Sequence, residues 1–464
     1  MYLFGRDVIY TDASAITADN IRQELARAVG YHSKNELEIR YLYDYYRGNQ
    51  PVLTRTKQIR PEINNKIVVN RANEIVSFKV GYLMGEPVQY VCRGNDSDHS
   101  DGIIQLNGYM MDENKAAKDR EIAEWNHICG TAYRMVLPAA DDREEDEAPF
   151  DIYTLDPRYA FVVYSSGLGN KPMMGVKYVA LENGGIIYSV YTSTEYFEIV
   201  NGRITKHEAH ALGMIPIIEY PANMERMGAF EPVISLLDAI NITESNRMDG
   251  VEQFVQSLMV LKGASMESEE FNSLRQAGGI EIPADADVKI LSEQLDQQQT
   301  QTLIDDMYDA VLTICGMPNR NSGATGGDRR GAVIYRDGWS SAEGRAKNSE
   351  MMFRNSERQF LKLALRIARE TRGLQVRPGH LEIRFTRRNY ENVMEKMQVL
   401  IGMLSSNMID PLLAFEHCGM FADPQTAHQQ SMEYAKQKRA ETERELNLRA
   451  GVHDDEETVD DAAV

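Results

Sequence analysis

The sequence predicts an α+β protein in which long helices flank a β-rich central unit. Three observations lead to this expectation. Apolar residues recur every three or four positions over long stretches in both halves of the chain. Between 132 and 218 they instead alternate or run together in short segments, such as "AFVVYS" and "GVKYVA", that Gly, Asn or Pro separates. The 464 residues, 43% of them hydrophobic, suffice for more than one core, and we expect about two to four domains.

The first elements are expected to be helices. "TADNIRQELARAV" and "SKNELEIRYLYDYYRG" carry apolar residues at helical spacing within 17–50, and Ser33 and Glu36 have the spacing of a capping box. Asn70 is placed to cap a further helix that ends at "GEP", and "VQYVC" then predicts a strand. Another helix is expected from about 109 to 128, before the β-rich unit begins.

The second half predicts a long helix, a small insert and two returning helices. Pro232 suits the first helical position, and the segment that it opens suits a helix of about 45 Å. A small α/β insert follows, and then the helix "QTQTLIDDMYDAVLTIC". After a Gly-rich loop, 332–372 is expected to be helical over about 60 Å, with bends at Gly338 and Gly344. "HLEIRFTRR" predicts a returning strand, and the remainder is expected to be helical up to an acidic, disordered tail.

Charge and cysteine content narrow the classes of function. The formal net charge of −20 argues against a protein that wraps nucleic acid on a basic surface, although nucleic acid that passes without being held stays possible. Four scattered cysteines argue against a disulfide framework or a zinc site and favour a reducing compartment. The stretch "MYLFGRDVIY" is short and followed by polar residues, so no signal peptide is expected, and without a run of about 18 apolar residues we expect no membrane-spanning helix.

No catalytic or metal-binding pattern stands out. "HEAH" at 207–210 lacks one residue of the HExxH spacing and lies among predicted strands, so no zinc is expected there. "DSDHSDG" begins like a calcium loop, but its sixth position is Asp101 and its twelfth is Asn107, so a surface loop is expected. The Gly-rich stretch 316–332 has no Walker lysine and follows a helix, which excludes a Walker loop and a dinucleotide-binding fingerprint. We therefore expect no catalytic residue, no metal and no cofactor.

The order of the predicted elements indicates a projecting stalk. Two long helices joined by a distal insert bury little surface in one subunit, so their apolar residues need partners. Identical neighbours around a ring are the simplest partners. The Gly-rich loop at the inner end of the stalk would then point inward.

Several segments between about residues 30 and 420 resemble those of one protein family and occur in the same order as in that family: "YYRGNQPVL", "NNKIVVNRANEIVSFKVGYLMGEPVQY", "TLDPRYAFVVY", "GMIPIIEYPAN", "FEPVISLLDAIN" and "LMVLKG". They resemble the portal proteins of tailed bacteriophages, and the type found in long-tailed phages of Gram-positive hosts most of all. The most specific piece is "YLMGEP" at 82–87.

The resemblance implies a portal fold that assembles as a ring. Its parts are a mixed α/β wing, long stem helices, a small α/β clip, a tunnel loop, a kinked long helix and a helical crown. Carried onto this chain, they are an N-terminal arm (1–19), the wing (20–230 and 374–390), the stem helices (231–261 and 296–315), the clip (262–295), the tunnel loop (316–331), the long kinked helix (332–373), the crown (391–450) and an acidic tail (451–464).

The resemblance also implies a function and partners. About twelve copies would form the ring at one capsid vertex. Double-stranded DNA would pass through it without sequence specificity during packaging and ejection. The terminase packaging motor and the head-tail adaptor would dock on the ring, and the major capsid and scaffolding proteins would be further partners. The protein would lie in the virion, and in the host cytoplasm during assembly, with no contact to a membrane and no enzymatic activity.

Five residues of the tunnel loop are expected to contact the DNA backbone: Asn319, Arg320, Asn321, Arg329 and Arg330. The arginines can touch phosphates and the asparagines can bond to the backbone without reading the sequence of the bases. The glycines would let the loop change shape as the duplex advances. The alternative is a solvated hinge whose arginines pair with neighbouring carboxylates.

Seven acidic residues of the two long helices are expected to line the channel: Asp238, Glu244, Asp249, Glu252, Asp305, Asp306 and Asp309. An acidic wall repels phosphate, so the duplex can slide instead of sticking. The alternative is that these residues are ordinary solvated charges or form salt bridges between subunits.

Two other classes of function compete with the channel. An enzyme such as a nuclease or an ATPase would need a carboxylate cluster or a phosphate loop, and the sequence shows neither. A cytosolic structural scaffold or adaptor oligomer without a DNA channel would be expected to carry helical repeats, and no repeat of about 20–50 residues is visible.

Overall fold

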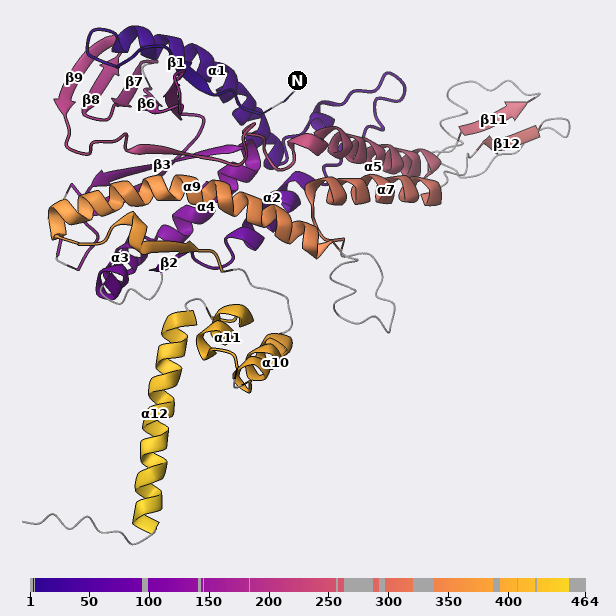
Figure 1. Cartoon of the computed structure of the whole chain (residues 1–464). Helices are drawn as coiled ribbons and strands as arrows, with labels where there is room; N and C mark the ends of the chain where they lie inside the picture. Colours follow the sequence, from indigo (N-terminus) through magenta and orange to yellow (C-terminus); the bar gives the residue numbers. More distant parts are fainter. Residues whose placement is uncertain are drawn as a thin grey trace, which may run out of the picture.

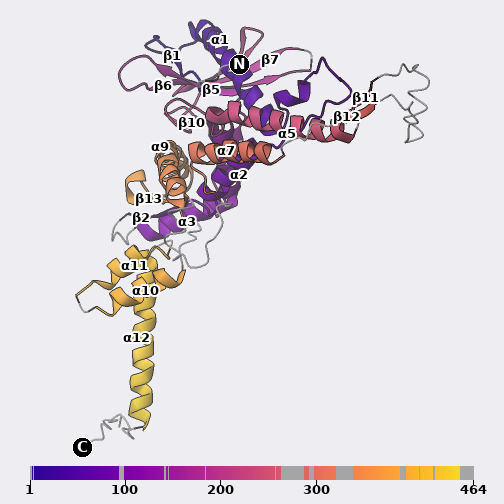
Figure 2. The same ribbon diagram turned by 90° about the vertical axis from the view of Figure 1, so that its right-hand side faces the viewer.

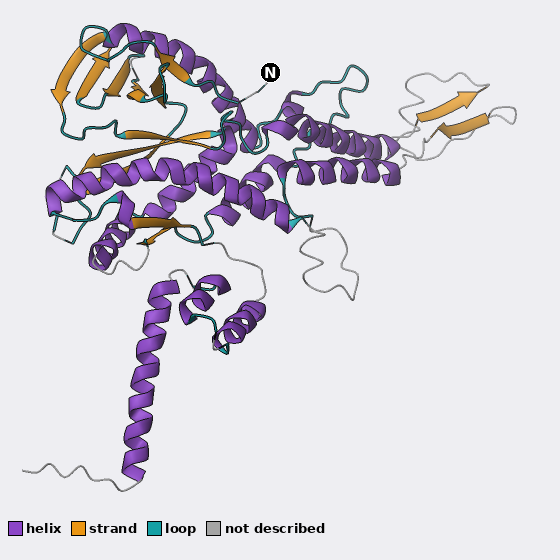
Figure 3. Ribbon diagram, in the orientation of Figure 1, coloured by secondary structure: helices purple, strands orange, loops and turns teal. Residues whose placement is uncertain are grey.

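Long helices packed against two β-sheets give the computed structural model the α+β architecture that the sequence predicts (Figures 1 and 3). The residues that the structure describes are 3, 5–93, 99–140, 143–144, 146–182, 184–255, 258–262, 287–291, 297–319, 338–386, 393–406, 408–421 and 424–449.

The larger sheet has six strands in the order β1-β5-β6-β7-β8-β9. β1 pairs with β5 in parallel, and the other neighbours are antiparallel, as short connections between successive strands require. Helix α1, Ile21–Tyr46, packs on this sheet, because Leu25 and Ala28 share a core with Phe161. The strands are β1 Ile9–Thr11, β5 Ala160–Ser165, β6 Pro172–Ala180, β7 Ile186–Tyr191, β8 Glu195–Val200 and β9 Arg203–Ala209.

The second sheet has three antiparallel strands in the order β10-β3-β4 and packs against helices α4 and α9. All three strands contribute side chains to the largest core, together with Phe353 and Phe360 of α9. The elements are β3 Thr131–Pro138, β4 Phe150–Leu155, β10 Ile217–Pro221, α4 Lys115–Cys129 and α9 Trp339–Arg372.

A third pairing returns the chain to its first half after α9. Strands β2, Gln89–Cys92, and β13, Leu381–Arg384, are antiparallel, which confirms the two strands expected from "VQYVC" and "HLEIRFTRR". Helix α2, Arg71–Leu83, precedes β2 and begins at the predicted cap. The side chain of Asn70 accepts a hydrogen bond from the backbone N–H of Asn73.

Helices α5, Ile234–Val255, and α7, Gln297–Cys315, lie side by side and project away from the sheets (Figures 1 and 2). The short strands β11, Leu258–Lys262, and β12, Asp287–Leu291, form an antiparallel pair beyond the outer end of the helices. The arrangement is the stalk that the order of elements predicts.

Three helices follow β13, and each packs against the next in sequence order: α10 Val393–Leu404, α11 Pro411–Cys418 and α12 Pro424–Arg449. Asp410 caps α11 by accepting a hydrogen bond of 2.9 Å from the N–H of Leu412. Single 3-10 turns lie at Pro51–Thr54, Glu231–Val233 and Pro378–His380.

The capping box expected at Ser33 and Glu36 is wrong. Helix α1 runs without a break through both residues, and the hydroxyl of Ser33 donates to the carbonyl oxygen of Gly30 at 2.8 Å. A serine inside a helix can bond to the preceding turn in this way, so its spacing to a glutamate did not mark a helix start.

Three helix boundaries also differ from the prediction. The helix expected from 109 to 128 is two helices, α3, Ser100–Asp112, and α4, because Asn114 adopts the left-handed conformation that asparagine tolerates. α5 ends at Val255, so the chain after it pairs as β11 where helix was expected. α9 begins at Trp339, with Gly338 as its left-handed N-cap.

Candidate functional site

The acidic residues predicted to line a channel fall into two groups, and the first is held inside the subunit. Asp238 on α5 accepts a hydrogen bond of 2.9 Å from the hydroxyl of Tyr45. Burial raises the pKa of Asp238 and this hydrogen bond lowers it, with burial the larger effect. The carboxylate of Asp249 has only 4% of its side-chain surface exposed and contacts Arg55 at 3.1 Å and also Lys57.

Asp249 belongs to a polar ladder along α5. Three α5 side chains at four-residue intervals accept hydrogen bonds from alternate backbone N–H groups of an extended segment, which we call the strap (residues 65–69). The pairs are Asn241 with Val69 at 2.9 Å, Ser245 with Ile67 at 3.0 Å and Asp249 with Asn65 at 2.7 Å. The spacings match, since four helical residues rise about 6 Å and two extended residues span about 6.6 Å.

The ladder gives Asp249 a structural role. Burial raises the pKa of Asp249, but the hydrogen bonds from Lys57 and Asn65 outweigh burial and lower it overall. The residue therefore remains a carboxylate that fixes the strap to α5. The sequence did not reveal this contact, because the strap lies 184 residues before its partner.

The second group of acids is more accessible. Asp305, Asp306 and Asp309 are exposed and follow one another on a single face of α7. Their described partners are local: Asp305 accepts from the amide of Gln301, and Asp309 accepts from the amide of Asn319. On α5, Glu244 lies 3.9 Å from Arg247, and exposed Glu252 accepts from the amide of Asn65.

Arg320, Asn321, Arg329 and Arg330 lie outside the described residues, so the structure places Asn319 alone of the five predicted DNA-contact residues. The chain before Asn319 is an ordered helix end. The N–H of Gly316 donates to the carbonyl of Thr313 at 3.1 Å, and the N–H of Met317 donates to that of Leu312 at 2.8 Å. These two bonds, with Gly316 at a φ of +64°, form a Schellman motif, so α7 ends with its last carbonyls satisfied.

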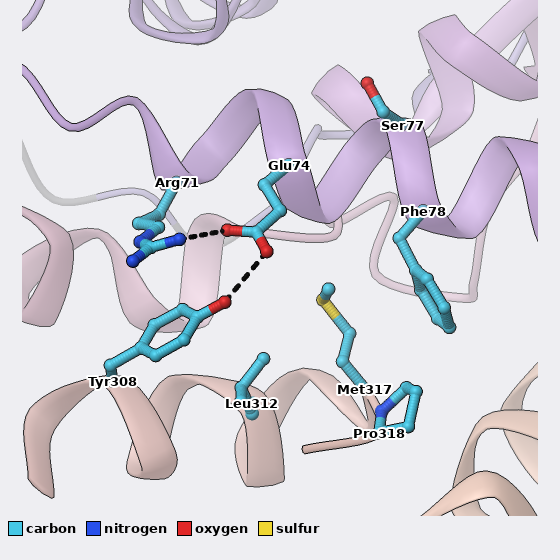
Figure 4. A pocket seen from close by; sticks show the side chains of 8 residues that line it. All are labelled: Arg71, Glu74, Ser77, Phe78, Tyr308, Leu312, Met317 and Pro318. Atoms are coloured by element: carbon cyan, nitrogen blue, oxygen red, sulfur yellow. Dashed lines mark hydrogen bonds and ion pairs between the residues drawn. The ribbon is translucent and has the colours of Figure 1, made fainter. Parts of the chain in front are cut away.

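A cavity of about 430 Å³ lies between α2, α7 and the first residues after α7 (Figure 4). Glu74 of α2 accepts hydrogen bonds from Arg71 at 2.7 Å and from the hydroxyl of Tyr308 at 2.8 Å. The guanidinium of Arg71 also lies 3.9 Å from the centroid of the Tyr308 ring, a cation–π contact. Leu312 and Met317 form an apolar wall of this cavity. The contacts of Glu74 and Arg71 with Tyr308 connect α2 to α7.

Four buried charges join α4, β3 and α9. Lys115 contacts Asp119 at 2.6 Å and Glu357 at 2.8 Å, and Arg134 contacts the same two carboxylates at 2.5 and 3.2 Å. We call these four residues the buried ionic cluster; each has at most 3% of its side-chain surface exposed. Tyr220 also donates to Glu357 at 2.7 Å.

The cluster is balanced, with two positive and two negative charges. Burial raises the pKa of Glu357, but the nearby Lys115 and Arg134 outweigh burial and lower it, so Glu357 stays charged. No pattern in the sequence indicates the cluster as a unit, because Arg134 and Glu357 are 223 residues apart.

The two histidines of "HEAH" have other partners. β9 carries His207, which lies 3.0 Å from a carboxylate oxygen of Glu195, and His210 lies 3.1 Å from the carbonyl oxygen of Thr192. In the described part of the chain, no group of three or more His, Cys, Asp or Glu side chains is arranged to hold a metal ion. Among the described helices, none combines the length and apolar character needed to cross a bilayer.

Comparison with known proteins decides the family. A family model described as "Phage portal protein, SPP1 Gp6-like" matches residues 30–445. The chain belongs to this phage portal protein family. The resemblance carried by segments such as "YLMGEP" is thereby confirmed, and a portal function with a place in the virion follows from membership of the phage portal family.

No curated protein matches the chain. Among solved structures, a chain in "Neck of empty GTA particle computed with C6 symmetry" is 11% identical with a TM-score of 0.41, and the match covers 75% of this chain and 90% of that one. A chain in "Virion of native gene transfer agent (GTA) particle" is 12% identical with a TM-score of 0.41, and the match covers 75% of this chain and 89% of that one.

Proposed function

We propose that this phage portal protein forms a closed ring of about twelve copies at one capsid vertex, and that double-stranded DNA is packaged and ejected through the centre of the ring. The observation that carries the proposal is the family match over residues 30–445. The projecting pair α5 and α7 supports it, because exposed apolar side chains on this pair, such as Ile242, Leu303 and Ile314, are available to neighbouring subunits.

On this proposal α5 and α7 are the stem helices, β11 and β12 belong to the clip, and α9 connects the tunnel loop to the wing. The outer end of the stem is the point at which the terminase packaging motor and the head-tail adaptor dock. The major capsid and scaffolding proteins contact the ring elsewhere, and assembly takes place in the host cytoplasm. The role is structural, and the ring has no enzymatic activity of its own.

We further propose that the channel wall is formed mainly by Asp305, Asp306 and Asp309. These three carboxylates share one exposed face of α7, and a row of negative charge repels passing phosphates. Asp238 and Asp249 do not belong to this wall, since Tyr45 and the strap hold their carboxylates. Glu244, which lies 3.9 Å from Arg247, and the exposed Glu252 are candidates for the same role.

The tunnel loop gives the first prediction. Replacing Arg320, Arg329 and Arg330 with Ala is expected to change DNA packaging rate or retention while the ring still assembles. Each exposed phosphate contact is worth about 1 kcal/mol or less, but repetition around the ring makes the sum measurable. The assay is packaging into empty procapsids over a range of salt concentrations, since screening weakens contacts between exposed charges.

A variant with the same three arginines changed to Lys is the matched control, because it keeps the charge. It is expected to behave closer to the parent than the Ala variant does, and the difference is expected to shrink at high salt. If the Ala variant packages and retains DNA like the parent at every salt concentration, the arginines do not contact DNA, and the loop is only a hinge.

A further inference from the structure

The residues that follow α7 lie next to the residue that precedes α9. A Cβ atom built on Gly338, the residue before α9, would lie 3.5 Å from the carbonyl oxygen of Met317 and 3.7 Å from the Cα of Pro318. The two ends of the tunnel loop therefore lie next to each other, and whatever holds these ends determines where the loop starts and finishes.

Helix α2 holds the leaving end. The ammonium group of Lys79 donates a hydrogen bond of 2.8 Å to the carbonyl oxygen of Cys315, the last residue of α7. A cation at this position satisfies a terminal carbonyl and interacts favourably with the helix dipole. The site is closely packed, because a Cβ on Gly316 would lie 2.2 Å from the Cδ of Arg345. Burial lowers the pKa of Lys79, as does the charge of Arg345.

The same helix also holds the returning end. Phe78 and Tyr82 stack on each other, with ring centroids 5.8 Å apart, and the ring of Trp339 lies 6.1 Å from the first and 6.0 Å from the second. The hydroxyl of Tyr82 donates to the carboxylate of Glu343 at 2.9 Å. The first turn of α9 is thus fixed to α2 by aromatic packing and one hydrogen bond to a charged group.

We infer that Phe78, Lys79 and Tyr82 form a clasp that holds both ends of the tunnel loop and so positions it in the channel. The inference rests on the proposed function, in which the tunnel loop acts on DNA in the channel. The three are positioning residues, because they act through the ends of α7 and α9 and not on DNA. Their placement at i, i+1 and i+4 of one helix lets a single element hold both ends.

The test is hydrogen exchange on assembled rings combined with DNA packaging. Lys79→Met is expected to raise the exchange rates of the Gly316 and Met317 amides about tenfold, because it removes a charged hydrogen bond from the helix end that these amides close. Trp339→Leu is expected to do the same for the amides of Ser341 and Ala342, which bond to the carbonyl of Gly338. Both variants are expected to form rings and to package DNA more slowly.

Two further variants separate positioning from general stability. Lys79→Arg is expected to restore both exchange protection and packaging, because a single carbonyl acceptor needs a cation and not a particular fork geometry. Lys177→Met removes an exposed lysine on β6 and is expected to change neither. Unchanged exchange in Lys79→Met would overturn the clasp, and so would faster exchange with packaging at the parent rate. Parent rings that take up no DNA would contradict the proposed function instead. In that case the exchange rates of the variants would still test the clasp, because they do not depend on packaging.

Discussion

Glu357→Gln is expected to cost about 3–5 kcal/mol of the free energy of unfolding, the range for removing one partner of a buried ion pair. The substitution keeps the shape of the side chain but leaves Lys115 and Arg134 with one carboxylate, that of Asp119, between them. Denaturant unfolding at one fixed protein concentration measures the change, because assembly also contributes to apparent stability.

The matched control is Glu370→Gln on the same helix. Glu370 pairs with Arg366 at 3.1 Å, both side chains are more than a third exposed, and an exposed pair of this kind is worth about 0.3–0.5 kcal/mol. Adding Lys115→Met to Glu357→Gln restores the charge balance and is expected to recover part of the loss. A Glu357→Gln protein within about 1 kcal/mol of the parent would show that the buried ionic cluster does not stabilise the fold.

The cluster also predicts a pH dependence. The pKa of Glu357 is lowered in the folded protein, so its contribution to stability is present above the pKa of an unfolded glutamate, about 4.3, and is lost as the pH falls through the folded value. The parent is therefore expected to lose more stability than Glu357→Gln between neutral and acidic pH. Equal losses in the two proteins would contradict this assignment.

Replacing residues 263–286 with Asn-Gly is expected to abolish infectivity while rings still form. Lys262 of β11 pairs with Asp287 of β12, so a two-residue turn can close the hairpin directly. The change removes most of the proposed clip, at the end where the motor and adaptor would dock. Complementation of a portal-deficient phage, scored as plaque titre, measures the effect. A Gly-Ser insertion at the exposed Asn201–Gly202 turn serves as the control, and a normal titre from the clip variant would refute the docking role.

The sequence was informative where structure is local. The sequence predicts the helix cap at Asn70, whose contact with Asn73 spans three residues, and it predicts the strands of the β-rich unit, because alternation lies within one strand. The sequence does not predict the break at Asn114, since the left-handed conformation of one residue leaves no periodic signal.

The candidate site was less predictable because its contacts connect distant segments. Spacing along α5 shows that Asp249 lies on one face of the helix but not that the strap covers this face. For the same reason no pattern around Lys79 indicates that its ammonium group contacts the end of α7, 236 residues later. Residues that are far apart in sequence meet only after the chain has folded, and a single sequence does not record which of them meet.

Electron microscopy of the purified full-length chain, with light scattering on the same sample, shows whether this phage portal protein forms a closed ring. We expect rings with a central hole at micromolar concentration and a mass about twelve times that of one chain. Particles of monomeric mass across the same concentration range, with no rings in the images, would contradict it.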